Sequence, residues 1–225
     1  MINPTHLSIA NRTYLLAINQ GNNTLRGRRS HTPRLLRAAI LADLALAGAI
    51  RDDRGRVAVC SGAPGTLEEV AARVLARIAR DKPRKWKDWI ERDRNASVDL
   101  LEAQLVNTGL VSIRKTTVFL VFPRREITVH DPRLIEQLRE RVRHVVFGPE
   151  PVASIPEDWA VLAALVTTAG LHEVVGRMEA FGHRKRIREL TSESGPLGPA
   201  LRRAMQEMDG AMAAIAASSA AVASG

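Results

Sequence analysis

Residues 159–171, WAVLAALVTTAGL, contain no charged side chain. The run is too short to cross a bilayer, which needs about 20 apolar residues. A helix at the surface of a globular protein shows a polar face, whereas a helix that is apolar all round is buried. This stretch therefore predicts a buried helix near the centre of a globular domain.

A second near-continuous apolar run from Leu35 to Ala47 predicts another buried helix, and Gly48 ends it in the position that glycine prefers. Further helical patterns follow without any βαβ alternation, so the expected fold class is mainly α. We expect a single helical domain with the Trp159–Leu171 helix near its centre. The predicted boundaries are a flexible N-terminus at 1–6, the domain at 7–215 and a frayed Ala/Ser tail at 216–225.

The helix boundaries follow from local signals. Thr66 with Glu69 three residues later has the form of a capping box and predicts a helix start. Asp131-Pro132 predicts another, because proline is favoured in the first turn. The pattern of residues 197–215 predicts a last helix.

Two hairpins are expected. Asp52 to Gly55 form a turn between Ile50 and the strand 57–59, which predicts a small hairpin. The more apolar hairpin pairs a strand at Val118–Phe122 with one at Ile127–Val129 around a turn at 123–126. Basic residues flank its apolar strand.

The net charge is strongly basic, with 33 Lys and Arg against 24 Asp and Glu, or +9. This excess indicates an anionic partner such as a phospholipid surface, nucleic acid or an acidic protein. Only five of the basic residues are lysine. Arginine suits bidentate contacts with phosphate, although a GC-rich genome produces the same bias.

The expected location is cytoplasmic with peripheral membrane association. The single cysteine, Cys60, excludes an internal disulfide and a Cys-rich zinc site. No run is long enough to span a membrane, and the N-terminus carries no basic region typical of a secretory signal.

No catalytic motif stands out, so we expect no enzyme, no catalytic or metal-binding residue and no cofactor. Ser61 lacks the Gly-x-Ser-x-Gly spacing of a nucleophile elbow, and the six histidines are scattered. His130 beside Asp131 has the composition of a general base, but a capping or solvated histidine is the simpler interpretation.

Three basic clusters are candidates for anion binding: residues 26–37, residues 82–94 and the two ends of the apolar hairpin. The first holds five arginines and no acidic residue, just before a helix N-terminus that favours anions. Any of the clusters is also compatible with an ordinary solvated face. An apolar strand between basic residues suits a peripheral membrane protein. The same strand could instead pack on the core or pair with another subunit.

A winged-helix nucleic-acid binder has a similar outline of helices and a basic hairpin. Its recognition helix needs exposed polar residues, and the run from Leu35 to Ala47 is almost wholly apolar. Nucleic acid is therefore the less favoured partner.

The order and spacing of several segments over residues 7–215 resemble the Golgi phosphoprotein 3 family, in its short bacterial form. The segments that carry the resemblance are Leu15–Ile18, Leu36-Arg37, Asp43–Ile50, Ala63–Gly65, Asp88–Glu91, Leu105–Leu110, Phe119–Pro123, Trp159–Leu171 and Lys185–Leu190.

The resemblance implies a single mostly helical domain around a central helix bundle, with a protruding apolar β-hairpin. It also implies a non-enzymatic peripheral membrane protein. Eukaryotic members bind phosphatidylinositol 4-phosphate and recruit the tails of glycosyltransferases. The first arginine of their headgroup pocket falls on Arg37, and the pocket tryptophan falls on Arg28. The two remaining pocket arginines fall near Asn95 and Val98, with Arg92 and Arg94 close by. These departures leave the identity of the headgroup open.

The sequence therefore predicts two sites. The predicted headgroup-binding residues are Arg28, Arg34, Arg37, Arg92 and Arg94. The predicted hairpin residues, which enter a membrane or form an interface, are Arg114, Lys115, Val118, Phe119, Leu120, Val121, Phe122, Arg124 and Arg125. The expected partners are an anionic phospholipid surface, a protein client and a second copy of the chain bound through the hairpin.

Overall fold

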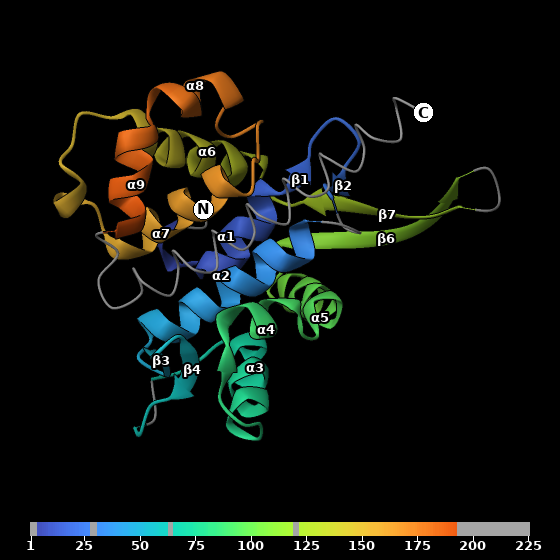
Figure 1. Ribbon diagram of the computed structural model, residues 1–225. Coiled ribbons are helices and arrows are strands. Elements are labelled where there is room, and N and C mark those ends of the chain that lie inside the picture. Colours follow the sequence, from blue (N-terminus) through green and yellow to red (C-terminus); the bar gives the residue numbers. More distant parts are fainter. Residues whose placement is uncertain (1–3, 28–30, 63–64, 119–121, 193–225) are drawn as a thin grey trace, which may run out of the picture.

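The computed structural model describes residues 4–27, 31–62, 65–118 and 122–192. Within these ranges the protein is mostly helical with small antiparallel hairpins (Figure 1). The helices are α1 (Ile9–Leu16), α2 (Thr32–Leu46), α3 (Glu69–Ala79), α4 (Trp86–Glu91), α5 (Arg94–Asn107), α6 (Pro132–Phe147), α7 (Glu157–Thr168), α8 (Arg177–Gly182) and α9 (Arg184–Ser192). The mainly α fold class is confirmed.

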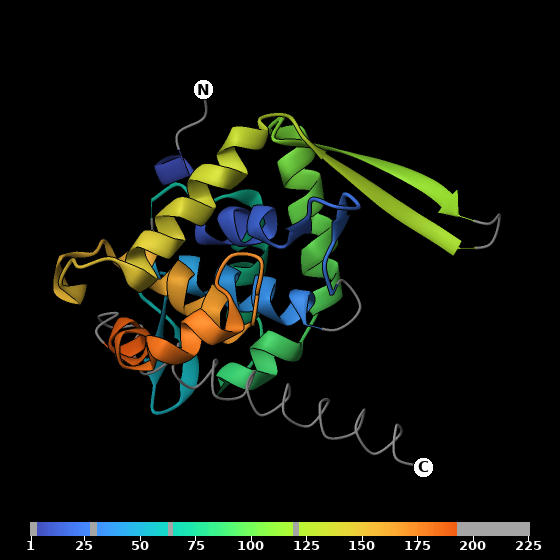
Figure 2. The same ribbon diagram turned by 90° about the horizontal axis from the view of Figure 1, so that it is seen from above.

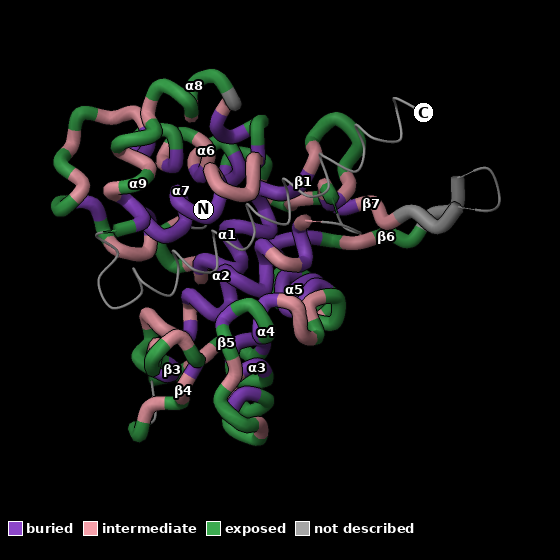
Figure 3. The backbone as a smooth tube through the Cα atoms, viewed as in Figure 1, coloured by how far each residue is buried: buried purple, intermediate pink, exposed green. Residues whose placement is uncertain are grey.

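The core forms around α1, α2 and α7, in which most residues are buried. Every residue of α1 is buried, and so are the eight consecutive residues from Trp159 to Val166 in α7. Helix α2 packs against α1, α5, α4 and α7, and Figure 3 shows this interior as the buried part of the chain. A helix without a polar face needs neighbours on all sides, which explains why the two apolar runs lie inside.

Several helix boundaries agree with the local signals. Asp131 precedes α6, and its side chain accepts a hydrogen bond from the Arg133 N–H at 3.1 Å. Gly48 and Gly109 follow α2 and α5 with φ of +69° and +68°, the left-handed conformation in which glycine avoids strain.

The capping box predicted at Thr66 is wrong, because α3 begins only at Glu69 and Glu68 precedes it. The Glu68 carboxylate instead accepts hydrogen bonds from Ser8, Asn11 and Gln104, on other elements of the fold. Tertiary contacts that the local pattern does not contain therefore set this helix start. The helix predicted at 197–215 and the tail at 216–225 lie outside the described residues.

The strands form short antiparallel sheets. The small hairpin is confirmed as β3 (Ile50–Asp53) and β4 (Arg56–Val59), and β5 (Arg84–Lys85) pairs with β4. In addition, β1 (Ile18–Asn19) pairs with β2 (Thr24–Leu25) across a turn.

The long hairpin consists of β6 (Val111–Val118) and β7 (Phe122–Val129) and projects from the helical body (Figures 1 and 2). The register pairs Val118 with Phe122, so the predicted turn at 123–126 is wrong and lies within β7. At the root, the buried Val111 lies opposite Val129, which is partly buried and packs against the core. Burial at the root sets the register, a contact with the helical body that the apolar pattern of residues 118–122 does not contain.

Gly148 ends α6 where the chain leaves the helix. A Cβ added at this position would lie 2.4 Å from the His144 carbonyl oxygen, the acceptor of the Gly148 N–H bond. We expect Gly148→Ala to lower the free energy of unfolding by about 1–3 kcal/mol, because backbone must move. Urea unfolding measures this loss, and Gly182→Ala, where a Cβ meets no atom within 4 Å, is the control. Equal stability of the two variants would contradict the expectation.

Candidate functional site: an arginine cluster and a projecting hairpin

Four of the five predicted headgroup residues lie within the described residues, where the start of α2 meets α4 and α5. Asp93 separates α4 from α5 and has a left-handed φ of 53°, so the chain turns sharply there. This turn brings Arg94 to the region of α2 that carries Arg34 and Arg37. We call Arg34, Arg37, Arg92 and Arg94 the arginine cluster. Arg28 lies outside the described residues.

Arg37 is the buried member of the cluster, with only 2% of the residue exposed. Its Nε donates to the Trp89 carbonyl oxygen and its Nη1 to the Ser97 hydroxyl, both at 2.9 Å. Its Nη2 has no hydrogen-bond partner. Burial lowers the pKa of the Arg37 guanidinium to about 10, so the group still carries its charge at neutral pH. A buried cation with an unused donor is the feature that an anionic ligand would satisfy.

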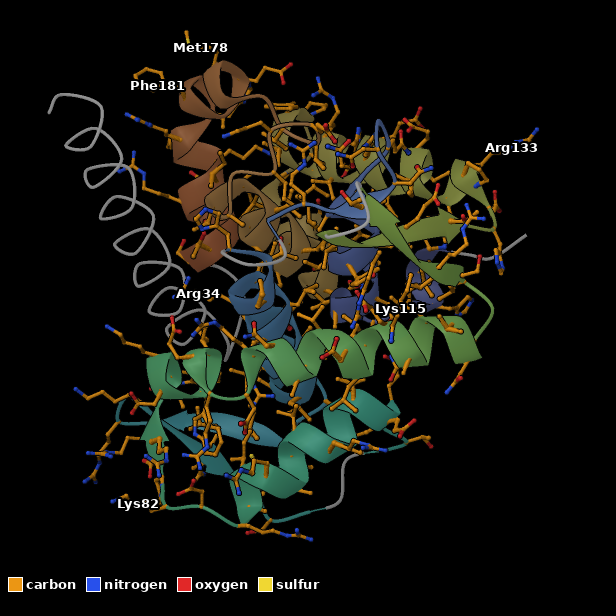
Figure 4. All side chains as sticks on the ribbon, turned by 90° about the vertical axis from the view of Figure 1, so that its right-hand side faces the viewer. Arg34, Lys82, Lys115, Arg133, Met178 and Phe181 are labelled. Atoms are coloured by element: carbon orange, nitrogen blue, oxygen red, sulfur yellow. The ribbon has the colours of Figure 1, made fainter. Side chains whose placement is uncertain are left out.

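Arg34 and Arg94 converge on one carboxylate. Arg34 Nε and Arg94 Nη1 each donate to Glu91 at the end of α4. The charge of Arg34, after burial, contributes to lowering the pKa of Arg94, which shows that the two cations repel. Their side chains are 21% and 31% exposed, so both guanidinium groups reach solvent. Figure 4 labels Arg34 in this region.

His31, directly before α2, adds no positive charge at neutral pH. Its pKa is lowered first by burial and then by the charge of Arg34. The positive charge of this part of the cluster therefore comes from three arginines, and the carboxylates of Glu91 and Asp93 oppose it.

Arg92 points to a different neighbourhood. Its Nη1 lies 3.3 Å from an Asp81 oxygen, and its guanidinium lies 5.9 Å from the centre of the Trp89 ring. Arg92 is thus paired with the segment after α3, whereas Arg34 and Arg94 are paired with Glu91.

Asn95 and Val98, near which two pocket arginines of the similar family fall, differ in exposure. Val98 is buried and apolar, whereas Asn95 is exposed. Sequence reasoning did not single out Ser97 or Glu91 as site residues, although both contact the cluster. The only available signal was that Glu91 lies in the segment 88–91 that carries the family resemblance.

The basic residues at the base of the hairpin have unequal surroundings. Arg125 donates to Asp99 at 3.1 Å and also to Glu102, whose side chain is 4% exposed. Arg114 pairs with Glu126 across the strands at 2.9 Å and is 77% exposed. Lys115 is exposed. Arg125 thus ties β7 to α5, while Arg114 and Lys115 remain at the surface.

The far end of the hairpin carries the remaining predicted residues. Backbone pairing places Val118, Phe122 and Arg124 there. Phe119, Leu120 and Val121 lie outside the described residues.

Pro123 in β7 fits the ladder without loss. The Ile127 N–H donates to the Asn23 carbonyl oxygen at 2.7 Å, on the side away from β6. Successive residues of a strand direct their backbone nitrogens to opposite sides, so residues four apart share a side. The nitrogen of Pro123 is therefore directed away from β6, like that of Ile127. Its missing N–H therefore costs no bond between β6 and β7.

Helix α5 connects the two parts of the site. It begins with Arg94 of the cluster, carries Asp99 and Glu102 along its length, and leads through Gly109 into β6. The cluster and the root of the hairpin are therefore fixed to the same rigid element. An open groove of about 590 Å³ lies elsewhere, between β7 and α6, and none of the four described arginines lines it.

Together these elements define a class of protein: a mostly helical domain with a projecting β-hairpin and a surface cluster of arginines. A family model described as Golgi phosphoprotein 3 (GPP34) matches residues 9–208. The chain belongs to the Golgi phosphoprotein 3 family, as the order of sequence segments predicted. A search of curated proteins gives no significant match. None of the helices in the described ranges has the length and apolar character needed to span a membrane.

Proposed function

We propose that this protein docks peripherally on membranes that contain anionic phospholipids and presents a partner protein there. Arg34 and Arg94 bind the phosphate of a headgroup beside the unused Nη2 donor of Arg37. The far end of the β6–β7 hairpin enters the membrane interface. Membership of the Golgi phosphoprotein 3 family supports the proposal, because the family resemblance implies headgroup binding.

The observation that carries the proposal is that three guanidinium groups lie together and outnumber the nearby carboxylates of Glu91 and Asp93. A phosphate oxygen would take over the donors that Arg34 and Arg94 now give to Glu91. Charge-assisted bonds from arginine to phosphate are among the stronger polar contacts. A bound phosphate would also relieve the repulsion between Arg34 and Arg94.

The burial of Arg37 changes its expected role within the site. Its Nε and Nη1 are held by Trp89 and Ser97, so the side chain cannot swing toward a ligand without breaking both bonds. Arg37 contributes a fixed positive charge and one donor, while the more exposed arginines make the adjustable contacts. Arg92 is committed to Asp81 and contributes mainly to the local potential.

The test is sedimentation with phosphatidylcholine vesicles that contain either no anionic lipid, phosphatidylserine or phosphatidylinositol 4-phosphate. We expect wild-type protein to pellet with anionic vesicles and less so at high salt. Arg34→Gln/Arg94→Gln should weaken binding about tenfold or more, because each basic residue near an anionic surface contributes about 1 kcal/mol.

Arg51→Gln/Lys82→Gln is the matched control, since it removes the same charge from exposed residues outside the cluster. It should bind nearly as well as wild type. If both double variants lose vesicle binding equally, binding depends on the net charge of the protein and the proposed headgroup site is wrong. Equal pelleting with neutral and anionic vesicles, or none with either, would overturn the proposal.

The second candidate is a protein-interaction or oligomeric scaffold without lipid binding. The length of the hairpin favours it, because α5 and β2 cover β6 and β7 only near the root while the strands continue outward. Uncovered strand edges pair readily with other strands. Size determination with and without residues 114–126 separates the candidates: deletion that dissociates an oligomer but leaves vesicle binding intact identifies an interface.

A winged-helix nucleic-acid binder is less well supported. Helix α2, the candidate recognition helix of such a fold, has buried residues along most of its length and packs against five other helices. No exposed face remains there to enter a DNA groove.

A further inference from the structure

Helix α8 exposes the two most exposed large apolar side chains in the described part of the chain. Met178 is 84% exposed and Phe181 is 61% exposed, compared with 41% for Val59 and 42% for Val106. Figure 4 shows Met178 and Phe181 together at one end of the molecule, opposite Lys82. Two neighbouring apolar side chains held in water indicate a contact surface.

The exposure of Met178 and Phe181 follows from how α8 is attached. Glu179 forms a two-pronged ion pair with Arg143 of α6, with contacts of 3.0 and 2.9 Å. The same carboxylate accepts the Gly176 N–H at 3.0 Å. Because consecutive helical residues are rotated by about 100°, Met178 and Phe181 share a face of α8 that is turned away from Glu179. The apolar pair is thus presented by an anchored element.

Helix α9, which follows α8, places exposed positive charges next to this pair. Its inner side carries Leu190, which is buried, and Arg186, which donates to the Val145 carbonyl oxygen at 2.8 Å. Its outer side exposes Arg184, Lys185 and Arg188. We call Met178, Phe181, Arg184, Lys185 and Arg188 the α8–α9 surface.

The charge of this surface is only partly compensated. Lys185 Nζ lies 4.0 Å from a Glu189 oxygen, at the limit of an ion pair, and the Lys185 side chain is 89% exposed. The guanidinium of Arg184 lies 3.9 Å from the centre of the Phe181 ring. An arginine stacked on an aromatic ring leaves an apolar body with a charged edge, the arrangement favoured at the boundary between headgroups and acyl chains.

We infer that the α8–α9 surface is a second membrane contact, separate from the arginine cluster and the hairpin. Met178 and Phe181 enter the interface of an anionic bilayer, and Arg184, Lys185 and Arg188 contact lipid phosphates. Charge complementarity selects an anionic bilayer as the occupant, since an apolar pair beside the exposed cations of α9 matches acyl chains beneath negative headgroups. This inference rests on the proposed function, because it requires that the protein meets a membrane.

The test places an environment-sensitive fluorophore (NBD) at residue 178. The protein is Met178→Cys in a Cys60→Ser background, labelled and mixed with phosphatidylcholine vesicles with or without phosphatidylserine. We expect a blue shift and an intensity increase with anionic vesicles only. The same fluorophore on Val59→Cys in β4 should not respond, because this surface is not part of the proposed contact.

Charge variants provide an independent readout by sedimentation of the full chain. Lys185→Gln/Arg188→Gln should weaken binding to phosphatidylserine vesicles about thirtyfold, at about 1 kcal/mol for each charge. Arg51→Gln/Lys82→Gln should not. Arg34→Gln/Arg94→Gln should leave the blue shift at residue 178 in place at saturating lipid, since the two contacts are separate.

Two outcomes overturn the inference while the proposed function stands. In the first, the protein pellets with anionic vesicles but the fluorophore at 178 does not respond. In the second, the fluorophore is already in an apolar environment without vesicles, which identifies another segment of the chain or a second copy as the occupant. If the protein pellets with no vesicle, the proposed function and this inference both fail.

Discussion

Arg125→Met is expected to lower the free energy of unfolding by about 3 kcal/mol, because it removes a cation that pairs with the buried Glu102 carboxylate. The Glu102 side chain is 4% exposed, and its other oxygen accepts a hydrogen bond from the Tyr14 hydroxyl at 3.1 Å. Removing one member of a buried ion pair costs more than the pair itself contributes. Urea unfolding measures the loss.

Arg114→Met is the matched control, since Arg114 lies on the same hairpin and also pairs with a glutamate. It should change the free energy of unfolding by less than about 0.5 kcal/mol, because an exposed pair is well solvated and screened. The double variant Arg125→Met/Glu102→Gln should regain part of the loss, because no buried charge is left unpaired. Equal effects of Arg125→Met and Arg114→Met would show that Arg125 does not anchor the hairpin to α5.

The second large effect concerns pH and Asp43 on α2. Its two carboxylate oxygens accept the N–H groups of Ile9 and Ala10 at 2.8 and 2.9 Å, at the first turn of α1. Burial raises the pKa of Asp43 to about 7, the charge of Glu68 adds to this, and the two hydrogen bonds together with Arg12 oppose it. Asp43 thus joins α2 to α1 through a group that titrates near neutrality.

The sign follows from the direction of the shift. A folded-state pKa above the ordinary carboxyl value means that the folded protein holds a proton that the unfolded chain has already lost. The contribution of Asp43 is therefore full below the ordinary pKa and is lost as pH rises toward about 7. Because Asp43 retains some solvent contact, we expect wild-type protein to lose about 2 kcal/mol between pH 5 and pH 8 through this group, less than the full shift implies.

Asp43→Asn is the control, because asparagine keeps one acceptor but does not titrate. The measurement is urea unfolding of both proteins at pH 5 and pH 8. The stability advantage of wild type over Asp43→Asn should shrink as pH rises. Two proteins whose stabilities change in parallel with pH would show that Asp43 stays in one protonation state.

The sequence alone determined the elements whose signals are local. The apolar runs at 35–47 and 159–171 became buried helices, since a helix without a polar face has no stable place at the surface. Asp131 and Gly48 marked helix ends because capping depends on residues within one turn. The same local order also carried the family assignment over residues 9–208.

Only the tertiary structure decided what each charged residue contacts. In the sequence, Arg37 and Arg125 are both basic residues next to apolar segments, and nothing local distinguishes them. One is buried against Trp89 and Ser97, about 50 and 60 residues away in the chain, and the other is fixed to Glu102. The start of α3 was likewise set by the contacts of Glu68 with Ser8 and Gln104. Burial and ion pairing depend on which distant segments the fold brings together, and no local pattern contains that information.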